Sequence, residues 1–145
     1  MVPEEGVTVV PNDTTKYMQN VATMKYTYDM ISDAYYDGRT ICIFRLSDVI
    51  LCKAEIENNL NGPAAALPYL NQIRARAGAP EYGKHNRFPA PSTKEAMNDA
   101  ILKERGYELV FEFQRRADLI RFGKYEEVVN AHLKKLGIAQ PTNVT

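Results

Sequence analysis

The sequence predicts a mainly α-helical protein, built from helical hairpins with long irregular loops and little or no β-structure. Three observations support this fold class. Apolar residues recur at helical spacing from Arg45 to Asn59. A second helix is marked by Pro63 at its first turn and by Gly78 just after its end. Ser92 to Glu95 then has the pattern of a capping box, in which two side chains satisfy free backbone N–H groups where a helix begins.

The composition excludes several classes of protein. The chain has 145 residues, and its 18 basic side chains balance 18 acidic ones. We therefore expect no nucleic-acid partner, and no direct membrane span because no apolar run approaches the ~20 residues that a bilayer requires. Cys42 and Cys52 lie in apolar runs and are predicted to be buried thiols rather than a disulfide framework.

Three segments are expected along the chain. Residues 1–44 form an irregular loop or extended segment, whose last part, 39–44, fits a strand and a straight connector equally well. Residues 45–137 form the helical domain. Residues 138–145 are a tail that we expect to be truncated, and both chain ends suggest an excised fragment.

The first two helices, over 45–59 and 63–77, are predicted to form a hairpin. Ala54, Ala66 and Leu70 lie where small and large side chains interlock between antiparallel helices, a spacing that resembles one tetratricopeptide-type unit. Because much of the first helix is apolar around its circumference, we expect it to be covered on two sides.

A punctuated loop over 79–91 is expected next, and then three more helices. The third helix is predicted over 93–114, a short one over 118–122 and a last one over 124–136. Lys134 and Lys135 stand in the final turn of the last helix, where the helix dipole favours cations.

A row of carboxylates marks one face of the third helix. Glu104, Glu108 and Glu112 are spaced four residues apart, and like charges at that spacing repel by a few tenths of a kcal/mol per pair. Apolar residues flank the row, so the carboxylates are expected to be half-buried and to need donors. The candidate donors are Arg45, Arg74, Arg76, Arg105, Arg115, Arg116 and Arg121.

Three interpretations of this charged cluster are open. The favoured one is a structural ion-pair network that clamps helices together, and the second is a solvated helix face. The third is a pair of catalytic carboxylates, for which Asp48 and Glu55 are the candidates because they share a helix face about 10 Å apart. The sequence has no nucleophile elbow, phosphate loop or dinucleotide fingerprint, and His85 and His132 are isolated, so neither a metal nor a cofactor is expected.

Tyrosines in the irregular segments are the candidate ligand-binding residues. Tyr35, Tyr36 and Tyr82 either pack within loops or present rings on which a sugar face stacks. Asn86 and Arg87 are among the polar side chains near them that sugar hydroxyls would need.

Three runs carry a resemblance to a known family. "FRLSDVILCKAE", "ALPYLNQIRARAG" and "ILKERGYELVFEFQRRADLIRFGKY", in this order, resemble the SusD/RagB family of Bacteroidetes outer-membrane nutrient-binding lipoproteins. The resemblance covers about Met24 to Tyr125. It implies a non-enzymatic binder of oligosaccharides, or alternatively of peptides. An N-terminal lipid would hold this protein at the cell surface. There it would cap a TonB-dependent, SusC-like transporter and serve nutrient uptake in polysaccharide utilisation.

The resemblance also implies which residues are scaffold. Family members are several times longer, so this chain resembles their C-terminal portion, and surface anchoring and transporter docking would belong to a longer parent because the lipobox cysteine is absent. The motif residues read as a structural ion-pair network formed by Arg45, Glu55, Arg74, Glu104, Arg105, Glu108, Glu112, Arg116, Asp118 and Arg121. Ligand residues are expected in variable loops, which leaves Tyr35, Tyr36 and Tyr82. The alternatives are a helical protein–protein interaction module docking on the transporter and a glycoside hydrolase fragment.

Overall fold

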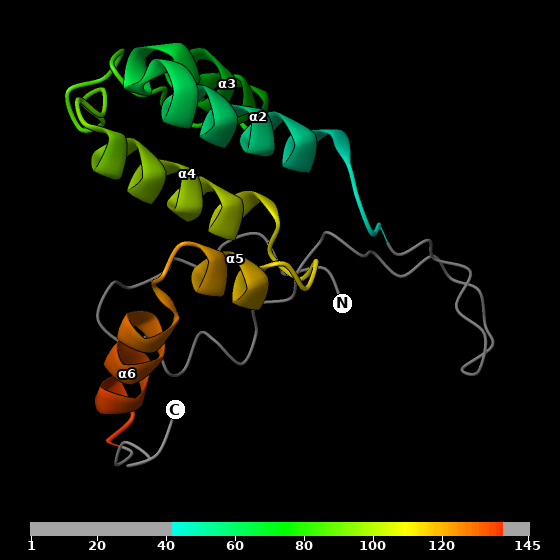
Figure 1. The fold of residues 1–145 in the computed structure, drawn as a ribbon, viewed down its shortest axis with the longest axis vertical. Coiled ribbons are helices and arrows are strands. Elements are labelled where there is room, and N and C mark those ends of the chain that lie inside the picture. Colours follow the sequence, from blue (N-terminus) through cyan, green and yellow to red (C-terminus); the bar gives the residue numbers. More distant parts are fainter. Residues whose placement is uncertain (1–41, 138–145) are drawn as a thin grey trace, which may run out of the picture. The chain divides into compact units, whose positions relative to one another are not determined.

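The computed structural model describes residues 42–137, and this part of the chain is helical (Figure 1). The five helices described are α2 (Leu46–Asn61), α3 (Pro63–Arg76), α4 (Lys94–Glu108), α5 (Arg115–Arg121) and α6 (Tyr125–Lys135). Within 42–137 the β-structure is limited to one isolated bridge between His85 and Phe88, so the mainly α prediction is confirmed. The predictions for 1–41, which include Tyr35 and Tyr36, and for the tail 138–145 lie outside the described residues.

Helices α2 and α3 form the predicted hairpin. Gly62, at φ 87°, joins them in a conformation that side chains with a Cβ rarely adopt, and Pro63 opens α3 at a position where no backbone N–H is needed. The second helix ends at Arg76, and Gly78 follows it at φ 66°. Both boundaries of α3 therefore lie where the Pro and Gly residues predict them.

The hydrophobic core forms where α4 packs on both helices of the hairpin, and Figure 1 shows the three helices side by side. Ala54 and Ala66 allow close approach, and Leu70 and Ile73 fill the space between the helices, as their spacing predicts. Each fully buried large side chain of this kind contributes about 1.5–3 kcal/mol. The buried members of the core are Leu51, Ala54, Ala66, Leu70, Ile73, Met97, Ala100 and Ile101.

The outer face of α2 differs from the prediction. Helix α2 packs against both α3 and α4, but Leu46, Val49 and Ile56 are 73%, 60% and 56% exposed, so this further apolar face is not covered within residues 42–137. Helix α2 therefore has apolar residues on two faces. The face that bears Leu51 and Ala54 lies in the hydrophobic core.

The loop after α3 is tied to the hairpin by side chains of α3. The Asn71 amide accepts from the Tyr82 backbone N–H at 2.8 Å and donates to the Tyr82 carbonyl at 2.9 Å. The Arg74 guanidinium lies 4.6 Å from the Tyr82 ring centroid and 4.7 Å from that of Phe88. A loop with four prolines and glycines is thereby held against the core.

Helix α4 begins one residue later than the capping-box prediction. Thr93, not Ser92, is the N-cap, and its side-chain oxygen accepts from the backbone N–H of Ala96 at 3.1 Å. Both residues carry a hydroxyl that can cap a helix, so residue type alone does not choose between the two registers.

Helix α4 also ends six residues before the predicted Gln114. Phe111 and Phe113 adopt left-handed backbone conformations, with φ 63° and 62°, which an α-helix cannot contain. Phe113 is 87% exposed instead of facing the core, whereas Leu109 is buried. Glu112 therefore lies on a turn and not on the helix that carries Glu104 and Glu108.

The last two helices pack in sequence, α5 against α4 and α6 against α5. In α4, Gly106 leaves room for the Arg115 guanidinium, since a Cβ there would lie 2.8 Å from Arg115 Nη1. Gly123, at φ 66°, ends the short helix as predicted.

No residue of α6 is buried. No helix of residues 42–137 is long and apolar enough to cross a membrane.

The two cysteines are both free thiols, but their predicted burial is wrong for one of them. Cys42 is exposed and Cys52 is half-buried. Burial raises the pKa of the Cys52 thiol above its ordinary value, although the nearby Arg105 charge opposes that shift.

Candidate functional site

Arg45, just before α2, joins the start of that helix to the end of α4. Its Nε lies 2.8 Å from Glu112 Oε2, and its Nη1 pairs with the Glu108 carboxylate. Its Nη2 also donates to the backbone carbonyl of Glu108, and Nη1 to the Ser47 hydroxyl. A single guanidinium thus binds the Glu108 carboxylate and carbonyl at the end of the helix and the Glu112 carboxylate on the turn that follows.

These contacts determine how Glu108 titrates. Its burial alone would raise the carboxyl pKa, but hydrogen bonds and charge from Arg45, with help from Ser47 and Arg76, hold that pKa below its ordinary value of 4.5. Burial likewise opposes the charge of Arg45, and its two carboxylate partners outweigh this effect and raise its pKa. Glu108 is therefore ionised near neutral pH.

Arg74 and Glu104 form a second, fully buried pair. Arg74 Nη1 lies 2.7 Å from Glu104 Oε2, and both side chains are 5% exposed. Arg74 Nε also donates to the Pro80 carbonyl at 2.6 Å. With the Tyr82 and Phe88 rings beside it, this guanidinium connects α3, α4 and the loop between them.

Arg105 is the centre of a third group of charges, at 3% exposure. Its Nη2 lies 2.7 Å from Asp48 Oδ1, and its Nη1 lies 3.8 Å from Glu55. Its Nε lies 2.9 Å from Asp118 Oδ2, a contact that is electrostatic because its geometry is not that of a hydrogen bond. Burial lowers the Arg105 pKa and the two aspartates raise it, with the net result above its ordinary value. Helices α2, α4 and α5 meet at this guanidinium.

Arg121 extends the group to the surface. It pairs with both carboxylate oxygens of Glu55, with Nη2 to Oε1 at 2.9 Å, and its Nη2 reaches Asp118 Oδ1 at 3.0 Å. The hydrogen bond to Glu55 is the main cause that raises the Arg121 pKa. Arg116 is also expected in the ion-pair network, but its guanidinium lies beside an aromatic ring, 5.7 Å from the Tyr125 ring centroid.

Asp48 and Glu55, the candidate catalytic pair, lie within this group. Both carboxylates face the Arg105 guanidinium, and Glu55 is also held by Arg121. A glycoside hydrolase needs one carboxylic acid that keeps a proton and one free carboxylate on opposite sides of a bond. Two carboxylates directed at shared guanidinium groups do not provide that arrangement.

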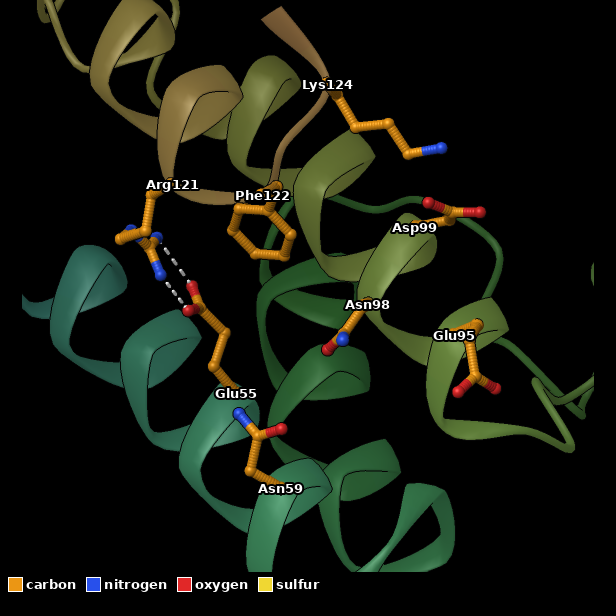
Figure 2. A pocket seen from close by; sticks show the side chains of 8 residues that line it. All are labelled: Glu55, Asn59, Glu95, Asn98, Asp99, Arg121, Phe122 and Lys124. Atoms are coloured by element: carbon orange, nitrogen blue, oxygen red, sulfur yellow. Dashed lines mark hydrogen bonds and ion pairs between the residues drawn. The ribbon is translucent and has the colours of Figure 1, made fainter.

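A cavity of about 500 Å³ lies beside the Arg121–Glu55 pair (Figure 2). On one side α2 contributes Glu55 and Asn59, and α4 contributes Glu95, Asn98 and Asp99. Figure 2 shows the Asn98 and Asn59 side chains in the space between these two helices. The volume is within the ~300–1,000 Å³ range of small-molecule sites.

The end of α5 and the start of α6 supply the other wall. Arg121, Phe122 and Lys124 line the cavity there, and the Phe122 ring also packs against the hydrophobic core. The hydrogen bond to Glu127 and its charge, with the charge of Asp99, raise the pKa of Lys124. Sequence reasoning missed this cavity, because its residues come from three separate segments and share no spacing.

The match to a family model decides which family this chain belongs to. The model described as the SusD family matches residues 6–145. The chain belongs to the SusD family. The quoted runs of the sequence lie within the matched residues.

Two relatives from Formosa agariphila are similar to part of the chain. SusD-like protein P25 is 44% identical over 87 residues, which is 60% of this chain and 16% of the relative. SusD-like protein P38 is 37% identical over 95 residues, which is 64% of this chain and 19% of the relative. The matched region thus spans less than a fifth of the length of these curated relatives. No solved structure matches the chain.

Of the predicted ligand-binding tyrosines in this SusD-family chain, Tyr82 lies in the described part. It is half-buried, and its ring makes an edge contact with Phe88, with centroids 5.9 Å apart. Tyr35 and Tyr36 fall outside residues 42–137. Within that range no group of three or more His, Cys, Asp or Glu side chains is arranged to hold a metal ion.

Proposed function

We propose that this chain is part of a non-enzymatic protein that captures oligosaccharides at the outer-membrane surface. The observation that carries the proposal is the SusD family match over nearly the whole chain. In this proposal an N-terminal lipid on the protein at its native length holds it at the surface. A SusC-like, TonB-dependent transporter is its partner and receives the glycan.

In this proposal the ion-pair network is scaffold and does not bind the ligand. The buried guanidinium groups of Arg74 and Arg105 already have carboxylate partners, so they have little capacity left for a ligand. Recognition is assigned instead to side chains outside the network, including Tyr35, Tyr36 and Tyr82. The way Arg105 and Arg121 hold Asp48 and Glu55 supports a binding role rather than hydrolysis.

Titration calorimetry tests the proposal. A panel of neutral and acidic oligosaccharides is titrated into the protein at its native length, and we expect heat of binding for at least one glycan without release of shorter products. Absence of binding across the whole panel contradicts glycan capture, and product release contradicts the non-enzymatic role.

A second candidate function is a helical module that docks on a protein. The exposed apolar residues Leu46, Val49 and Ile56 on the outer face of α2 favour it. The test is binding of the purified protein to a purified SusC-like, TonB-dependent transporter, compared with the variant Val49→Lys. Affinity for the transporter that Val49→Lys abolishes, together with no affinity for glycans, would favour this function over the first.

A further inference from the structure

We infer that the cavity between α2, α4 and the α5–α6 link is a binding site for a neutral sugar ring of an oligosaccharide. This inference rests on the proposed function and goes further, because it names the site and the charge class of the ligand. The family match does not assign any ligand to these residues.

The polar side chains of the cavity suit a ligand that carries hydroxyl groups. Each hydroxyl donates one hydrogen bond and accepts others, so its site must offer both kinds of partner. Asn59 offers an amide donor and a carbonyl acceptor, Asn98 offers an amide donor because its carbonyl already accepts from Asn58, and the Asp99 carboxylate accepts. Lys124 adds a donor on the opposite wall.

Phe122 supplies apolar surface to the cavity. Its side chain lines the cavity, and Figure 2 shows the ring directed toward the space between α2 and α4. The Arg121 guanidinium lies 4.8 Å from the ring centroid, and the ring also packs against the hydrophobic core, so its orientation is held from two sides. An aromatic ring among polar groups is a usual arrangement in ligand sites.

The charge of the cavity selects a neutral ligand. Glu55 and Arg121 neutralise each other as an ion pair, and the charge of Lys124 is shared with Glu127. Glu95 and Asp99 remain as the carboxylates of the α4 wall, both on exposed residues. A uronate or a sulfate ester placed between them would be repelled, whereas a neutral hydroxyl can donate to either one.

Contacts within the protein hold two parts of the cavity walls in place. The buried Asn58 amide donates to Asn98 Oδ1 at 2.8 Å and to the Lys94 carbonyl at 2.9 Å, which orients the Asn98 side chain. The Glu55–Arg121 pair joins the α2 wall to the end of α5. A site held in this way loses little conformational entropy when it binds.

Two variants and a matched control test the site in the protein at its native length. Asn59→Ala removes a side-chain amide and Asp99→Asn replaces a carboxylate by a neutral amide, both at exposed positions, so the fold should be retained. Asn61→Ala is the control, because Asn61 is exposed on the same helix, pairs with Glu57 and does not line the cavity. The probes are neutral malto-, xylo- and galacto-oligosaccharides and, as the acidic arm, oligogalacturonate.

We expect Kd for the bound neutral glycan to rise about three- to tenfold in Asn59→Ala and in Asp99→Asn, and to stay within twofold in Asn61→Ala. Neutral glycan binding that both cavity variants leave unchanged overturns the site, while the proposed function stands. Stronger binding of oligogalacturonate than of any neutral glycan overturns the charge class. Absence of binding by the unmodified protein to every glycan overturns the site and the proposed function together.

Discussion

Arg105 holds together more carboxylates than any other residue in the described part of the chain. It lies at the contact of α2, α4 and α5, with Asp48 at 2.7 Å and Asp118 at 2.9 Å. A buried ion pair adds little net stability over an apolar pair, but removal of one partner leaves the other charge buried without compensation. The free energy of unfolding should therefore depend on Arg105 mainly because its removal would leave buried carboxylates without a compensating charge.

Replacement of Arg105 should destabilise the fold strongly. Arg105→Ala leaves the Asp48 and Asp118 carboxylates without the buried positive charge beside them, and we expect the free energy of unfolding to fall by about 3–5 kcal/mol. Arg76→Ala is the control, because Arg76 pairs with Glu108 from the surface and should contribute less than about 1 kcal/mol. Urea denaturation of both variants measures the difference, and equal losses would contradict the role of burial.

The low pKa of Glu108 predicts how stability depends on pH. A carboxyl group whose pKa is lower in the folded state stabilises the fold above its unfolded pKa, and this contribution is lost as the pH falls through the folded value. The free energy of unfolding should therefore decrease from about pH 5 downward, and less steeply in Glu108→Gln. Urea denaturation of both proteins across this pH range measures the slopes. Parallel slopes would show that Glu108 is not linked to folding.

At the scale of elements, the turn after α4 combines exposure with backbone strain. Phe111 and Phe113 are left-handed and exposed, and the Arg45 contacts to Glu108 and Glu112 hold the turn. A left-handed residue with a Cβ costs about 1–2 kcal/mol. The turn is therefore stabilised by its charges and not by its aromatic rings.

Two substitutions at left-handed positions should have opposite effects. Phe113→Gly removes the strain of a left-handed backbone conformation at a residue with a Cβ, and it loses little buried surface. It should therefore raise the free energy of unfolding by up to about 1 kcal/mol. Gly123→Ala places a Cβ at φ 66° with no atom within 4 Å to clash, so it should lower that free energy by about 1 kcal/mol through the backbone alone. Thermal denaturation of both variants measures this, and effects of the same sign would contradict the assignment of strain.

Some element boundaries follow from the sequence and others do not. Pro63 and Gly78 predict both ends of α3, because each has a backbone preference that a helix interior does not tolerate. The end of α4 was predicted wrongly, because the apolar period continues through Leu109 and Phe113 and no glycine marks the turn. Tertiary contacts from Arg45 stabilise that turn, and such contacts have no local signal.

At the scale of the whole described unit, stability is concentrated in α2, α3 and α4. The buried core lies in these three helices, whereas α6 packs only on α5 and buries no residue. Backbone amides of Leu51, Leu70 and Ile101 should therefore exchange most slowly with deuterium, and those of α6 much faster. Hydrogen exchange followed by NMR or mass spectrometry measures this. Equal protection of α6 and α4 would contradict the unequal distribution of stability.

The ion-pair network and the cavity differ in how far the sequence predicts them. The residues of the ion-pair network lie in recognisable motif runs, and their charges require partners, so the sequence predicts a network. The cavity depends on how α2, α4 and the α5–α6 link pack, and Asn59, Asn98 and Phe122 are ordinary residues at unrelated positions. Only the three-dimensional arrangement brings them together.

The central proposal is that the charged network maintains the fold while recognition takes place outside it. Glu108→Ala tests this most directly in the protein at its native length, with thermal denaturation and glycan titration on one sample. We predict a loss of about 1–3 kcal/mol, seen as a melting temperature lower by several degrees, and a Kd within twofold of the unmodified protein. An unchanged melting temperature, or a Kd raised tenfold or more while the variant remains folded, would contradict it.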